Sequence, residues 1–235
     1  MKKHISVFML IARHTVLKML ALLAVFTAAE VMWARFILPC PPELTLGTLP
    51  VLLFLVCHIV LSILLWSAAS DSGSRVSYRV GCLRVGEREF FLWQALWGCC
   101  AYFILWAWQA ALAVVLAQYS LSRLEPQFAG PQALMIAFYR NGFLHALVPL
   151  ADTAVWLRNA AMVLFLGLVS AWIPKRQREG KKRAGLILTV LAIIWLPMVF
   201  QVEGRDGVIA VMLFCGACAA ALFIMAMFKK EEFDE

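Results

Sequence analysis

Two cysteines near the end of the chain, Cys215 and Cys218, have the spacing of a redox dithiol or of half a zinc site. A structural zinc site takes four protein ligands. This pair lies inside the apolar stretch 208–228, where no histidine or second cysteine pair joins it. Thiols in such stretches pack as small apolar groups. We therefore interpret the pair as structural, and the scattered positions of the other cysteines indicate no disulfide framework.

The histidines give no better metal site. They stand at positions 4, 14, 58 and 145, which is not a metal-ligand spacing, and only His58 lies deep in an apolar stretch. Haem ligation by His58 alone has no second feature to support it. We expect His145, in a less apolar region, to be an interfacial side chain.

Three ionisable residues, Glu30, Asp152 and Arg158, fall within apolar stretches. Charges at membrane depth are costly, so they usually pair with one another or mark a functional path. Asp152 and Arg158 are six residues apart and would point to different sides of a helix. We therefore expect Arg158 to pair with Glu30. Two interpretations stay open, a structural ion pair between helices and the lining of a pathway.

The most concentrated charged and aromatic segment is SYRVGCLRVGEREFFLWQAL, at positions 77–96 between two apolar blocks. Aromatic anchors supply binding energy at interfaces, and charges of both signs fix the register. The segment therefore predicts a docking element with Phe90 and Phe91 as the anchors. A simpler interpretation is a solvated loop whose arginines only orient the protein.

The composition of the chain indicates which class of protein carries these residues. The chain has 235 residues, of which 63% are hydrophobic and 15% charged, and its mean hydropathy is +0.84. This is too apolar for a soluble domain and indicates an integral membrane protein. The formal net charge of +7 does not indicate nucleic acid, because the Lys and Arg residues cluster at the ends of apolar blocks. That pattern is typical of helices oriented in a lipid bilayer.

We predict an all-α membrane protein with one transmembrane domain over residues 1–235. Six stretches are long enough to cross about 30 Å of hydrocarbon, at 18–38, 50–69, 91–118, 149–173, 184–202 and 208–228. A cleaved signal peptide ending near Ala29 is the rival for the first stretch. The apolar run continues past that point to position 38, which argues against cleavage.

Smaller elements complete the prediction. We expect an amphipathic helix at 1–17 and a surface-lying helix at 133–148, with the fourth span ending at Pro174. Gln94 and Gln109 should hydrogen-bond to neighbouring helices. The small residues around Gly216 should let the last helix pack closely. Basic clusters at 2–18, 75–88, 175–183 and 229–230 place both termini in the cytoplasm.

The segment at 83–92 resembles one in the membrane subunits of ABC-2 type transporters, of general form Leu-Pro-Val-Ser-Arg-Arg-Glu-x-Phe-Leu. The matching positions are Leu83, Val85, Arg88, Glu89, Phe91 and Leu92. Arg84 replaces the proline, and Gly86-Glu87 replaces Ser-Arg. In that family the segment joins the second and third spans and includes a coupling helix that sits in a groove of the ATP-binding subunit. The lead-in helix and six spans are also similar to that family.

The resemblance implies a permease subunit of an exporter in a bacterial plasma membrane. A second copy or a paralogue would complete the pathway, and a separate subunit would bind ATP and Mg²⁺. The docking residues would be Arg84, Glu87, Arg88, Glu89, Phe90 and Phe91. This chain carries no phosphate loop and no hydrolase motif, so we do not expect it to be an enzyme or to hold a cofactor.

Two other functions stay open. A membrane scaffold or accessory subunit would use the same cytoplasmic segment to hold a partner without transport. An intramembrane enzyme would use Glu30, Asp152 and His58, which form no recognisable constellation in the sequence.

Overall fold

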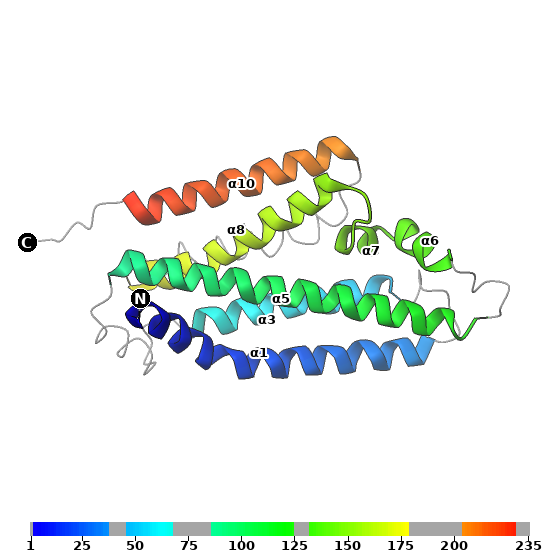
Figure 1. The fold of residues 1–235 in the computed structure, drawn as a ribbon. Helices are drawn as coiled ribbons and strands as arrows, with labels where there is room; N and C mark the ends of the chain where they lie inside the picture. The colour runs from blue at the N-terminus through cyan, green and yellow to red at the C-terminus, as the bar shows by residue number, and fades with distance from the viewer. Residues whose placement is uncertain (1, 38–45, 68–85, 125–131, 179–203, 229–235) are drawn as a thin grey trace, which may run out of the picture.

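A computed structural model describes residues 2–37, 46–67, 86–124, 132–178 and 204–228 (Figure 1). All secondary structure in these ranges is helical. The helices are α1 (Lys2–Ile37), α3 (Thr48–Ser67), α5 (Glu87–Leu121), α6 (Ala133–Arg140), α7 (Gly142–Leu147), α8 (Thr153–Arg178) and α10 (Arg205–Phe228).

Five of these helices are long and apolar enough to cross a membrane. Their apolar parts are Ser6–Phe36, Leu49–Ser67, Glu87–Leu121, Thr153–Gln177 and Arg205–Phe228. The class of all-helical membrane protein is thus as predicted. The sixth predicted span, at 184–202, lies outside the described residues and stays a prediction. α8 ends and α10 begins at opposite ends of the bundle, which is the order that a span between them requires (Figure 1).

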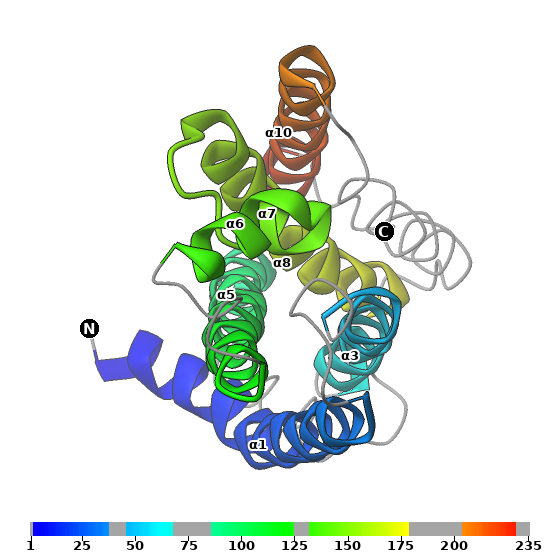
Figure 2. The same cartoon turned by 90° about the vertical axis from the view of Figure 1, so that its right-hand side faces the viewer.

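The bundle is organised around α5. α1 and α3 pack against it and against each other, and α8 packs along it and also contacts α10 (Figure 2). At 35 residues, α5 is about 50 Å long, which exceeds the hydrocarbon thickness. It therefore extends beyond the membrane or crosses it at a tilt.

The amphipathic helix predicted at 1–17 is not a separate element. α1 continues without interruption from Lys2 to Ile37. Val7 and Ile11 are buried, and the Phe8 ring lies edge-on to Trp93 and Trp97, at 5.9 and 5.8 Å between ring centroids. These contacts fasten the first turns of α1 to α5, and the expected position of this part on the membrane surface stays a prediction.

The surface helix predicted at 133–148 is two short helices. Asn141, between α6 and α7, has extended backbone angles that end α6. Its side-chain Oδ1 accepts from the N–H groups of Phe143 and Leu144, at 3.0 and 3.2 Å. Asn141 is thus the N-cap of α7. The stretch was predicted as one helix because its apolar residues continue past this cap.

The two helices α5 and α8 cross at a pair of glycines. A Cβ at Gly167 would lie 2.7 Å from the backbone nitrogen of Cys99 and would overlap its sulfur. A Cβ at Gly98 would lie 3.0 Å from the Gly167 carbonyl oxygen and would overlap the Ser170 hydroxyl. Small residues at such crossings let two backbones touch, which is a principal source of helix association in membranes.

Pro174 does not end the fourth span as predicted, because α8 runs on to Arg178. Proline has no N–H, so the carbonyl of Ser170, four residues earlier, loses its helical donor. Gln94 of α5 supplies a replacement, since its Nε2 lies 3.4 Å from that oxygen. This is the kind of compensation that lets proline persist inside a membrane helix.

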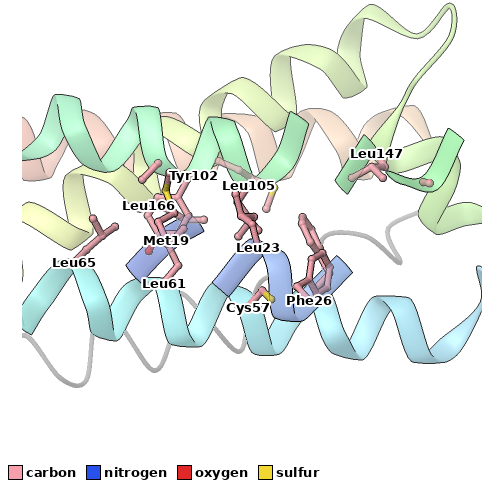
Figure 3. Close-up of a cluster of buried hydrophobic side chains, with 14 of the residues drawn as sticks. Met19, Leu23, Phe26, Cys57, Leu61, Leu65, Tyr102, Leu105, Leu147 and Leu166 are labelled. Atoms are coloured by element: carbon pink, nitrogen blue, oxygen red, sulfur yellow. The ribbon is translucent and has the colours of Figure 1, made fainter. Parts of the chain in front are cut away.

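The interior is filled by side chains from α1, α3, α5, α6, α7, α8 and α10, and Figure 3 shows part of this core. Met19 and Leu23 of α1, Leu61 of α3, Leu105 of α5 and Leu166 of α8 are among them. Many large apolar side chains also face outward, as expected where lipid replaces water. On α10, Gly216 is outward too: nothing lies within 4 Å of a Cβ placed there. Close packing by Gly216 is therefore absent from the part of the chain that the structure describes.

Candidate functional site

The charged part of the predicted docking segment is the first turn of α5. Gly86 is extended, and Glu87, Arg88 and Glu89 follow it with exposed side chains. Acidic residues suit a helix N-terminus because they face the positive end of the helix dipole. We name these three residues the charged tip. The tip continues directly into the membrane helix, so the described part of the short helix predicted at 84–92 is the start of α5 rather than a separate element. Arg84 lies outside the described residues.

The two aromatic residues beside the tip point inward. Phe90 is 2% exposed and Phe91 is 0% exposed. Phe91 belongs to a buried cluster with Val169 and Trp172 of α8 and Leu222 of α10. These rings are covered by the chain itself, so we do not retain them as anchors for a partner. The inward face follows from helical spacing, because Gln94, Ala95 and Gly98 continue it.

Two basic residues of α8 lie at the same end of the bundle. The Nζ of Lys175 donates to the carbonyl oxygen of Ala226, at 2.8 Å. Ala226 is in the last turn of α10, where carbonyls lack helical donors, so Lys175 caps that helix. The Arg176 guanidinium lies 4.4 Å from the centre of the Trp172 ring. These contacts fix the ends of α8 and α10 beside the start of α5 (Figure 1).

The buried carboxyl of Glu30 is held by α5. Glu30 is 0% exposed, and the Nε2 of Gln109 donates to its Oε1 at 2.9 Å. Its Oε2 has no hydrogen-bond partner. The predicted Glu30–Arg158 ion pair is therefore wrong. α1 packs on α3 and α5 rather than on α8 (Figure 2). The neighbour of Glu30 is therefore Gln109 of α5 and not Arg158 of α8.

Two further side-chain bonds join α1 to α5. The indole N–H of Trp97 donates to the Thr15 hydroxyl at 2.8 Å, and that of Trp108 donates to the Thr27 hydroxyl at 2.9 Å. With the Gln109–Glu30 bond, the contacts advance along both helices in the same direction. α1 and α5 are thus parallel, as the first and third spans of the predicted order must be.

Asp152 lies just before α8 rather than inside it. Its Oδ1 accepts from the N–H of Ala154 at 3.0 Å, which makes it the N-cap of the helix. The predicted span at 149–173 therefore begins too early. Because Asp152 precedes the helix, the angle between its side chain and that of Arg158 is not set by helical spacing. The two side chains line one cavity although six residues separate them.

Arg158 is 2% exposed, and its guanidinium is positioned by its neighbour. Its Nε and Nη2 donate to Oδ1 of Asn159, at 3.3 and 3.0 Å. The Nδ2 of Asn159 donates in turn to the carbonyl oxygen of Ala146 in α7, at 2.7 Å. We had not identified Asn159 from the sequence, although an amide next to an arginine inside an apolar stretch was a usable signal.

His58 is satisfied inside the core. Its Nδ1 lies 2.9 Å from the carbonyl oxygen of Phe54, so this nitrogen carries the proton. Its ring stacks on Tyr102, whose hydroxyl lies 2.7 Å from that of Ser62. Within the described ranges no three His, Cys, Asp or Glu side chains are placed to hold a metal ion. Glu30 bonds to Gln109, Asp152 caps α8 and His58 bonds to Phe54, so these three residues have different hydrogen-bond partners.

No match to this chain is found among protein-family models, curated proteins or solved structures.

Proposed function

We propose that this chain is the membrane-spanning permease subunit of an ATP-driven exporter of the ABC-2 type. It would lie in a bacterial plasma membrane with both termini in the cytoplasm. A second copy or a paralogue would share the pathway, and a separate subunit would hydrolyse ATP with Mg²⁺.

One observation carries the proposal: the charged tip is exposed at the end of a continuous membrane helix. Glu87, Arg88 and Glu89 begin α5, and no break separates them from its core-packed part. A helix without a break transmits displacement of its end along its length. A partner that moved the tip would therefore move the helix on which α1, α3 and α8 pack.

The burial of Phe90 and Phe91 changes which contacts the partner would make. Charges of both signs would determine partner choice and register at the tip. The Phe91 ring would instead connect the tip to α8 and α10, because it belongs to the buried cluster that holds Trp172 and Leu222. Movement of the tip would thus reach three helices directly.

The test is recovery of an ATPase with the tagged chain from its native membrane in mild detergent. The variant Glu87→Lys/Arg88→Glu/Glu89→Lys reverses each charge of the tip while leaving the buried face intact. We expect mass identification of an ATP-binding subunit with the wild-type chain, and its loss with this variant. Asp206→Lys, an exposed charge reversal at the other end of the bundle, is the matched control and should retain the partner.

Two outcomes would count against the proposal. Undiminished recovery of the ATPase with the triple variant would remove the tip as its docking element. Recovery of a partner without ATPase activity would favour the scaffold instead, since a scaffold needs docking but no ATP. Substrate-stimulated ATP hydrolysis by the assembled complex would distinguish transport from scaffolding.

A further inference from the structure

A cavity of about 410 Å³ opens at the end of the bundle opposite the charged tip. α6 and α7 form one side, and the beginnings of α8 and α10 form the other. Among the described residues that line it are Arg140, Arg158 and Arg205 and one carboxylate, Asp152. The ionisable side chains among them are thus mainly guanidinium groups.

The arginines occupy two levels of the cavity. Arg158 is almost fully buried and lies at the floor, whereas Arg140 and Arg205 are exposed at the rim. The Arg158 guanidinium is fixed by Asn159, which is itself bonded to α7. A cation held in place before binding loses little side-chain freedom when a ligand arrives.

His145 adds a polar group to the wall. Its Nδ1 is buried and has no hydrogen-bond partner, although its ring lies 5.2 Å from that of Tyr139 between centroids. A buried imidazole nitrogen without a partner is costly. Because this nitrogen has no accessible surface, a ligand in the cavity does not reach it, and the polar contacts on offer are those of the arginines.

We infer that this cavity binds a phosphate group, either free or in the headgroup of an anionic lipid. Guanidinium groups bind phosphate oxygens through paired, charge-assisted hydrogen bonds. Three guanidiniums at two levels match a group with several charged oxygens better than a carboxylate, which one arginine can saturate. The inference does not depend on the proposed transport function.

Exposed apolar side chains beside the cavity suit the lipid source. Tyr139 lines the cavity and is exposed, and Ile136, one helical turn before Arg140 on α6, is exposed too. Acyl chains could lie on that surface while the headgroup enters the cavity. Free phosphate would need only the cavity itself.

The experiment uses the full chain in phosphatidylcholine nanodiscs. One arm titrates inorganic phosphate by calorimetry. The other adds phosphatidylglycerol to the nanodiscs and counts lipids retained on the protein by native mass spectrometry. The rim variant Arg140→Gln/Arg205→Gln should weaken binding in the responding arm by about tenfold or more, as expected for the loss of charge-assisted bonds. Both rim residues are exposed, so this variant avoids the folding risk of changing Arg158.

Two further variants sharpen the result. Asp152→Asn should strengthen binding several-fold, because it removes the competing carboxylate and asparagine still caps a helix. Arg123→Gln removes an exposed arginine that is outside the cavity lining and should change nothing. Saturable phosphate binding would identify the free anion, and selective retention of phosphatidylglycerol would identify the lipid. Binding in neither arm, or equal binding by the rim and control variants, would overturn the inference.

Discussion

The two faces of α5 hold their neighbours in different ways. Toward α8, two glycines bring the backbones into contact, and Gly167 leaves no space for a methyl group. Toward α1, larger side chains bridge the gap through three hydrogen bonds, from Trp97, Trp108 and Gln109. In lipid the hydrophobic effect does not hold helices together. Close packing stabilises the first interface instead, and polar bonds stabilise the second. The comparison predicts that the first interface is sensitive to volume and the second to the loss of partners.

The largest expected effect is at the glycine crossing. Gly167→Ala places a methyl group against the backbone of Cys99, which cannot move aside as a side chain tip can. We expect the free energy of unfolding to fall by about 3 kcal/mol, the upper range for overpacking. Unfolding of the purified chain by SDS titration, followed by circular dichroism, measures this.

The control for that change is Gly216→Ala in α10. Nothing lies within 4 Å of the added methyl group there, and alanine is the better helix former. Stability should therefore stay the same or rise slightly. Equal losses for both substitutions would mean that the α5–α8 contact is not limited by volume.

The next largest effect concerns a bridge between α1 and α5. Gln109→Leu removes the donor to the buried Glu30 carboxyl and should lower the free energy of unfolding by about 2 kcal/mol. Changing Glu30→Leu as well should recover most of the loss, because replacing both partners by apolar groups is nearly neutral. SDS titration of both single variants and the double variant gives the coupling energy. A coupling near zero would contradict the pairing.

A polar contact also exists on the α8 side, and its role can be isolated. Gln94→Leu should cost about 1 kcal/mol because the Ser170 carbonyl loses its donor. In a Pro174→Ala background the helix supplies its own N–H to Ser170, so the same change should cost much less. Comparing the two costs by SDS titration is the measurement. The same cost in both backgrounds would show that Gln94 does not compensate for the proline.

The sequence predicts the apolar helices well because hydropathy depends on local residues. The spans expected at 50–69 and 208–228 correspond to α3 (Thr48–Ser67) and α10 (Arg205–Phe228), within a few residues. The predicted end of the fourth span at Pro174 was wrong. Gln94, which replaces the hydrogen bond that the proline removes, is remote in sequence and close only in the fold.

The candidate sites were predicted less completely for the same reason. The exposure of Glu87, Arg88 and Glu89 was expected from their charge, whereas their docking role stays a prediction. The partner of Glu30 could not be derived, since residue types do not tell which helices are neighbours. Interhelical bonds by Gln94 and Gln109 were predicted as a class and are confirmed, although their acceptors were unknown.

The smallest expected effect tests whether the bridges between α1 and α5 depend on depth in the bundle. Trp108 is 45% exposed to the surroundings, whereas Trp97 is buried, yet both donate to a threonine of α1. Trp108→Phe should cost about 0.5 kcal/mol, the average for a hydrogen bond between membrane helices, because lipid can fill the vacated space. Trp97→Phe should cost about 1 kcal/mol, since the same bond is lost and the buried space stays empty. SDS titration resolves the difference when the two variants are measured side by side, and a larger loss for Trp108 would show that lipid does not replace packing at this interface.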